Sequence, residues 1–224
     1  MKLFIYSDIS AALRGETDRK TIAGLQHVEA HRLLADAYRA LYRKTLPALK
    51  RRGEGKPYLA GRDAPHISLS HEGGIVGVVF SGEEVGLDIN RTTRAANERA
   101  CRRFLSGMKE SFPARPEDTT VYYATYREGE TYVPTPLSSV FGSDTARPFL
   151  QRADSKEDAA GRFCRAEACL KLSGGGFADL PSLGEISSRA RVLSFHLPSP
   201  HETYLVAIAE FVKEEKGSAP DGTV

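Results

Sequence analysis

The hydrophobic pattern near the start and the middle of the chain predicts short buried strands. KLFIY and GIVGVVF are continuous apolar runs of strand length. VGLDIN follows the second run after the turn SGEE and alternates with period two, so we expect these two segments to form a hairpin. The alternation leaves Asp88 and Asn90 together on one face of the second strand, opposite the apolar face that begins with Val85.

Longer segments with helical spacing of apolar residues predict three helices. The first extends from about Leu25 to Leu49 and ends near Pro47 and the basic segment KRRGEGK. NERACRRFL predicts a second helix, and RFCRAEACLKLSGGGF predicts a third that stops at the glycine run beginning with Gly174. Two further β-rich segments, ARVLSFHL and TYLVAIAEF, predict a closing antiparallel pair.

The order of these elements predicts an α+β fold with antiparallel sheets rather than a parallel βαβ array. Each part of the chain offers a helix and paired strands, so we expect a pseudo-dimer of two similar halves, each an antiparallel sheet packed with a long helix. The N-terminal half spans residues 1–92 and the C-terminal half residues 93–212, with an insertion at about 111–158. Residues 213–224 have the composition of a disordered tail.

Composition and charge argue against several classes of function. The 224 residues carry 31 Lys and Arg against 29 Asp and Glu, so the formal net charge of +2 does not indicate a nucleic-acid partner. No apolar run has the length of a signal-peptide core or a membrane span, so we expect no membrane partner. Three cysteines without a C-x-x-C pair are typical of reduced thiols, and we expect a cytoplasmic protein.

Two carboxylates and an amide on distant segments form a candidate metal site. Asp88 and Asn90 share a strand face, and Glu167 lies on the third predicted helix. Carboxylate and amide oxygens are the hard ligands that Mg²⁺ prefers. Polar residues that can bind phosphate are spread along the chain, namely Arg32, Lys56, Ser70, His71 and Lys171.

Simpler interpretations stay open for several of these features. Glu167 and Lys171 lie four residues apart, which is also the spacing of an ordinary ion pair on a solvated helix face. His27 and His31 in HVEAH have a zinc-binding spacing, but no Glu follows the first histidine, so we expect polar helix residues. The basic run Arg39–Lys56 would suit RNA, yet no aromatic stacking platform accompanies it.

The order of the motifs resembles the 4'-phosphopantetheinyl transferases, in particular the two-half, monomeric kind that activates peptide and polyketide synthases. The matching segments are KPYL, HISLSHEGG, VGLDIN and FCRAEACLK followed by glycines. VEAHRLLADAYRALY resembles the upstream helix of that family. The resemblance covers most of the chain except the insertion, and it depends on the order of the motifs because each one alone is short.

This resemblance implies a Mg²⁺-dependent enzyme that transfers the 4'-phosphopantetheine arm of coenzyme A to a serine of an apo acyl or peptidyl carrier protein and releases 3',5'-ADP. It implies that Asp88 and Glu167 hold Mg²⁺, with Asn90 as a ligand directly or through water. Lys171 would offset phosphate charge, and Glu167 would take the serine proton, directly or through a metal-bound water. The nucleotide end of coenzyme A would be held by Arg32, Lys56 and His71, and Ser70 would also bind coenzyme A.

The chain departs from the family pattern at four positions. Asn90 stands where a third acidic ligand is usual, and Ala166 replaces a lysine before the key glutamate. Phe163 replaces a tryptophan, and Glu72 replaces the second serine of an S-H-S motif. Asn90 and Ala166 leave a second hypothesis open, a degenerate relative that binds coenzyme A or a carrier protein without transferring the arm.

Overall fold

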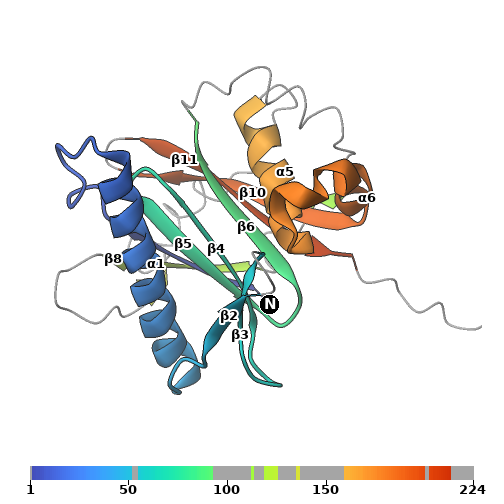
Figure 1. Ribbon diagram of the computed structural model, residues 1–224, viewed down its shortest axis with the longest axis horizontal. Coiled ribbons are helices and arrows are strands. Elements are labelled where there is room, and N and C mark those ends of the chain that lie inside the picture. Colours follow the sequence, from blue (N-terminus) through green and yellow to red (C-terminus); the bar gives the residue numbers. More distant parts are fainter. Residues whose placement is uncertain are drawn as a thin grey trace, which may run out of the picture.

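The chain folds into two main sheets, each covered by a long helix (Figure 1). The computed structural model describes residues 2–51, 55–92, 112–113, 119–125, 135–136, 159–199 and 202–212. It confirms an α+β fold with mainly antiparallel sheets. The helix predicted at NERACRRFL, most of the predicted insertion and the predicted tail lie outside the described residues.

The first sheet has the strand order β4-β5-β1-β8-β9. Its strands are β1 (Lys2–Asp8), β4 (His66–Glu72), β5 (Ile75–Ser81), β8 (Thr119–Thr125) and β9 (Thr135–Pro136). The β1, β4 and β5 strands pair antiparallel, whereas β8 pairs parallel with β1. The segments KLFIY and GIVGVVF are therefore confirmed as strands, and they are neighbours inside this sheet.

Helix α1 (Arg19–Tyr42) packs on the first sheet. It begins after Asp18, whose carboxylate accepts a 2.9 Å hydrogen bond from the Thr21 N–H, and it ends at Arg43, which has a left-handed φ of 55°. These caps place the helix earlier in the chain than the predicted range of about Leu25 to Leu49. Its buried face shares one core with the sheet, formed among others by Leu33, Leu34, Ala37, Ile5, Val78 and Phe80.

The second sheet has the strand order β6-β11-β10-β7. Its strands are β6 (Val85–Arg91), β7 (Phe112–Pro113), β10 (Ala190–Pro198) and β11 (Thr203–Phe211). The predicted antiparallel pair at the end of the chain is confirmed as β10 and β11. The predicted hairpin of GIVGVVF with VGLDIN is wrong, because β5 is paired on both edges by β1 and β4, and β6 pairs with β11 instead.

Serine hydroxyls connect the two sheets where β4 lies beside β6. The Leu87 N–H donates to Ser68 Oγ at 3.0 Å, and the Ile89 N–H donates to Ser70 Oγ at 3.1 Å. Side-chain oxygens thus accept hydrogen bonds that a neighbouring strand would otherwise accept through its carbonyl groups. The SLS segment of the sequence therefore joins the first sheet to the second.

Helix α5 (Ala159–Ser173) packs on the second sheet and is followed by the 3₁₀-helix η3 (Gly176–Ser182) and helix α6 (Leu183–Ser188) (Figure 1). It stops at the predicted glycine run, since Gly174 has a φ of 90°, a left-handed conformation that favours glycine. Two short strands, β2 (Leu49–Arg51) and β3 (Pro57–Leu59), form a separate antiparallel pair. Among the described helices, none has both the length and the apolar character needed to cross a membrane.

Candidate active site

A cleft of about 350 Å³ lies where α1, β2, β4, β6 and α5 meet. It contains most of the residues that the sequence predicts for the site, although they come from separate parts of the chain. The predicted residues that line it are Ser70, His71, Asp88, Asn90, Glu167 and Lys171. The fold therefore brings together the S-H motif, the VGLDIN strand and the third predicted helix.

The β6 strand places Asp88 and Asn90 side by side on its cleft face. Both residues are buried, with 2% of their surface exposed. Their backbones are held by β11, where Asp88 pairs with Ala207 and Asn90 pairs with Leu205. The predicted alternation of this strand is thus confirmed, and pairing with β11 fixes the backbone of both residues where their side chains line the cleft.

The carboxylate of Asp88 has protein partners on both oxygens. Its Oδ1 accepts from the Lys171 ammonium at 2.7 Å and from the Ser70 hydroxyl at 3.2 Å. Its Oδ2 accepts from the Asn90 amide nitrogen at 2.7 Å. A buried carboxylate is costly unless it is paired and hydrogen-bonded, and these three contacts meet that requirement.

Ser70 connects the strand backbone to the charged pair. Its Oγ accepts from the Ile89 N–H at 3.1 Å and from Lys171 at 3.0 Å, and it donates to Asp88. These contacts use the single donor and both lone pairs of the hydroxyl. Ser70 therefore orients Asp88 and Lys171 together, a role that the sequence did not reveal.

Glu167 and Lys171 both reach the cleft from α5, as their helical spacing predicts. The ion pair of Lys171 joins it to Asp88, which lies 83 residues away in sequence. This long-range contact shows that the lysine is more than the partner in a solvated i,i+4 pair. The buried Cys164 thiol lies beneath this region, 3.5 Å from the carbonyl oxygen of Asp88. Burial raises the pKa of this thiol well above its ordinary value, so it stays protonated.

The opposite wall of the cleft carries imidazole and guanidinium groups. His27 and His31 on α1 line it with ring centroids 4.4 Å apart, and Arg51 lines it from β2. Desolvation lowers the pKa of His31, and the nearby His27 and Arg51 lower it further. Desolvation also lowers the pKa of His71, with further contributions from Lys171 and His27. The i,i+4 spacing of HVEAH predicts that the two histidines share one face of the helix, and the structure shows that this polar face lines the cleft.

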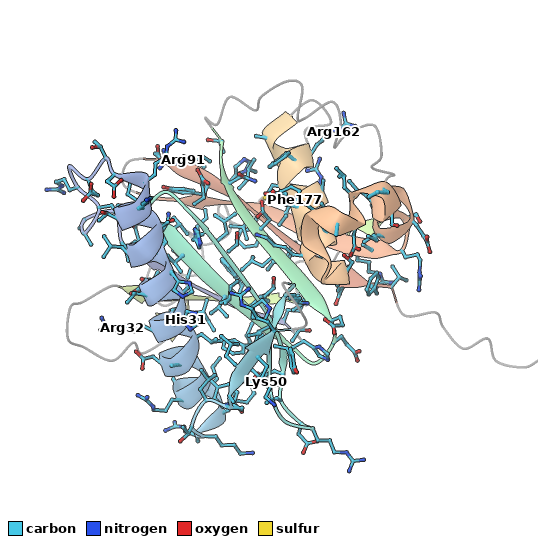
Figure 2. All side chains as sticks on the ribbon, in the orientation of Figure 1. His31, Arg32, Lys50, Arg91, Arg162 and Phe177 are labelled. Atoms are coloured by element: carbon cyan, nitrogen blue, oxygen red, sulfur yellow. The ribbon has the colours of Figure 1, made fainter. Side chains whose placement is uncertain are left out.

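Two predicted binding residues do not line this cleft. Lys56 lies in a neighbouring cleft of about 600 Å³, where its ammonium donates to Glu84 at 2.9 Å and to the Val85 carbonyl oxygen at 2.6 Å. Pro57 lines both clefts, so they adjoin. Arg32 extends from α1 away from His31, as Figure 2 shows. The structure therefore separates Arg32 and Lys56 from the residues around Asp88.

The donor set around Asp88 has the chemistry of a site for a hard divalent cation. Asp88, Asn90 and Glu167 supply two carboxylates and an amide to one cleft. Mg²⁺ is commonly held by one or two carboxylates together with waters and substrate phosphates, so these residues fit it. The described residues contain no group of three or more His, Cys, Asp or Glu side chains placed to hold a metal.

No protein-family model matches this chain, and no curated protein matches it. The resemblance to the phosphopantetheinyl transferases therefore depends on the order of the motifs and on the residues that meet in the cleft.

Proposed function

We propose that the protein is a 4'-phosphopantetheinyl transferase. It would transfer the phosphopantetheine arm of coenzyme A to a serine of an apo acyl or peptidyl carrier protein and release 3',5'-ADP. The observation that carries the proposal is the contact between Lys171 and Asp88 at 2.7 Å, with Glu167 in the same cleft. Together with Ser70 and His71 of HISLSHEGG, residues of three separate motifs of the resemblance line this cleft, in an arrangement of cations and carboxylates that suits a phosphate substrate.

The charges of the cleft support a substrate with phosphate groups. The Lys171 ammonium lies on the α5 side, and the Arg51 guanidinium lies on the opposite side, beside the imidazoles of α1. Phosphoryl transfer depends mostly on positioning and on charge neutralisation, so cations on both walls are what the reaction needs. Lys171 would lie against the pyrophosphate, and His71 would bind the nucleotide part.

The proposed reaction is a displacement at phosphorus. The hydroxyl oxygen of the carrier serine bonds to the phosphorus that carries pantetheine, and the bridging bond to the second phosphate breaks. The 3',5'-ADP leaves with the bonding electrons, and the serine proton passes to Glu167. A carboxylate that also holds a metal is a weak base, so we favour a water that relays the proton from the serine hydroxyl to Glu167.

Mg²⁺, when bound, would neutralise charge on the pyrophosphate. Asp88 and Glu167 are the residues that would hold it, and Asn90 would add a neutral oxygen. The proposal also includes a cytoplasmic monomer built as a pseudo-dimer of residues 1–92 and 93–212. A long helix covers each main sheet, α1 on one and α5 on the other, which supports two similar halves. The sheets exchange strands across residue 92, since β6 belongs to the second sheet and β8 to the first.

One observation favours the alternative of a non-catalytic relative. Lys171, Ser70 and Asn90 together satisfy both oxygens of Asp88, which is how a purely structural carboxylate would also be held.

The mass of apo carrier proteins separates the two functions. A panel of apo carrier proteins is incubated with coenzyme A, Mg²⁺ and the protein, and the mass of each carrier is then measured by mass spectrometry. The transferase adds the phosphopantetheine arm to the serine of at least one carrier, and Glu167→Gln abolishes the gain. Binding of coenzyme A without a mass gain on any carrier would support the non-catalytic alternative and reject transfer.

A further inference from the structure

The ion pair between Lys171 and Asp88 joins one fixed side chain to one that can move. The Asp88 side chain is 3% exposed and is held by Ser70 and Asn90 on β6, whose backbone pairs with β11. The Lys171 side chain is 34% exposed and reaches the carboxylate through a flexible four-carbon stem. The lysine can therefore leave the pair for another anion, whereas the aspartate cannot follow it.

The Lys171 ammonium contacts an oxygen of the carboxylate that would hold the cation. It lies 2.7 Å from Asp88 Oδ1, within the cleft that also contains Glu167 and Asn90. A divalent cation and an ammonium that contact the same carboxylate repel one another, so binding of the cation requires Lys171 to withdraw from Asp88. When no phosphate is present, this withdrawal breaks the charge-assisted contact of Lys171 with a buried carboxylate. The cost of breaking that contact opposes metal binding.

An anionic ligand removes that opposition. A phosphate group in the cleft offers the Lys171 ammonium a new partner, and the freed Asp88 oxygen then receives the cation. Each ligand thus favours the arrangement that the other needs. By linkage, the factor by which phosphate tightens metal binding equals the factor by which metal tightens phosphate binding.

We propose that Lys171 is the counter-ion of Asp88 in the metal-free protein, and that the site therefore binds a divalent cation and a phosphate ligand cooperatively. This inference rests on the proposed function and assigns a coupling between metal and substrate to that same site. It makes Lys171 the residue that couples the two ligands as well as a phosphate contact.

The test measures Mn²⁺ binding by electron paramagnetic resonance, with and without 3',5'-ADP, in the full chain. The wild type should bind Mn²⁺ weakly alone and about ten- to a hundredfold more tightly with the nucleotide, which is the usual range of such coupling. Lys171→Met should bind Mn²⁺ about tenfold more tightly than wild type without nucleotide and lose most of the coupling. Lys50→Met is the matched control, because Lys50 is exposed on β2 and does not line the cleft (Figure 2). This control removes the same charge and should keep wild-type affinity and coupling.

Thermal melting keeps the proposal testable if Lys171→Met folds poorly. Lys171→Met leaves the buried Asp88 carboxylate without its ammonium partner, so the melting temperature of this variant should be lower than that of wild type. Mn²⁺ should raise the melting temperature of the variant more than NaCl of equal ionic strength does. Lys171→Gln retains a hydrogen-bond donor and serves as a second variant with the same expected gain in metal affinity. Unchanged or weaker Mn²⁺ binding in both variants would overturn the inference.

The carrier mass assay is read separately from these titrations. If the wild type modifies a carrier while neither lysine variant gains Mn²⁺ affinity, the coupling is rejected and the proposed function stands. If the variants gain affinity and lose coupling while no carrier gains mass, the coupling is supported and the proposed function is rejected.

Discussion

Gly86 on β6 lies directly against the backbone of Ala168 on α5, with no room for a side chain between them. A Cβ at position 86 would also lie 2.6 Å from the Leu172 nitrogen, where a shift of backbone would be needed. Asp88 follows Gly86 by two positions on the same face of β6, and Lys171 follows Ala168 by one helical turn. The close approach of strand and helix therefore sets the distance between the two charged side chains.

Gly86→Ala should move α5 away from β6 and weaken both the fold and the site. Overpacking of this kind costs about 1–3 kcal/mol, which should appear as a lower free energy of unfolding in urea. The displaced Lys171 should also reduce transfer activity more than the loss of stability explains. Gly24→Ala is the control, because a Cβ at this position on α1 meets open space and alanine favours helix. A Gly86→Ala variant as stable and active as wild type would contradict the close packing.

Asp88→Ala and Glu167→Gln should each remove most transfer activity, since both residues are proposed to hold the metal. Their effects on stability should differ. Asp88 is buried and accepts three hydrogen bonds, so Asp88→Ala should lower the free energy of unfolding by about 1–3 kcal/mol. Glu167 is partly exposed, so Glu167→Gln should leave unfolding within about 0.5 kcal/mol of wild type. Near wild-type turnover of either variant at saturating Mg²⁺ would place the metal elsewhere.

Asn90→Asp should make the protein more dependent on a divalent cation. The Asn90 amide nitrogen lies 2.7 Å from Asp88 Oδ2, so a carboxylate there would place two like charges in contact in a buried site. The variant should melt at a lower temperature than wild type without metal, and Mg²⁺ should recover the difference. The Mg²⁺ concentration for half-maximal transfer should fall, whereas Asn90→Ala should cost less activity than Asp88→Ala because water can replace an amide ligand. If Asn90→Ala were as inactive as Asp88→Ala, Asn90 would contact metal or substrate directly.

The lowered pKa of His31 predicts a loss of stability in acid. The folded protein disfavours protonation of this exposed imidazole, because partial desolvation, His27 and Arg51 all oppose its positive charge. Below the unfolded-state pKa of about 6.5 the unfolded chain binds more protons than the folded one, so the free energy of unfolding falls as pH decreases. Urea unfolding of wild type and His31→Gln at several pH values below neutrality measures this difference. The wild type should show the steeper loss, and equal slopes would show that His31 does not contribute.

Local periodicity in the sequence determined which residues could act together within one element. The alternation of VGLDIN put Asp88 and Asn90 on one strand face, and the helical period put Glu167 and Lys171 on one helix face. The glycine run stopped α5 at Gly174. These features follow from backbone geometry over a few residues, so they can be predicted without the fold.

The tertiary structure decided which elements meet. Strand pairing assigned β5 and β6 to different sheets, against the local hairpin signal, because β1 and β4 occupy both edges of β5 and β6 pairs with β11. The same packing placed Lys171 beside Asp88, and it placed His31 on the wall of the cleft opposite α5. It also paired Lys56 with Glu84 in the adjoining cleft. A charged side chain takes whichever opposite charge the fold brings within a few ångströms, and local spacing contains no information about a partner that lies 83 residues away.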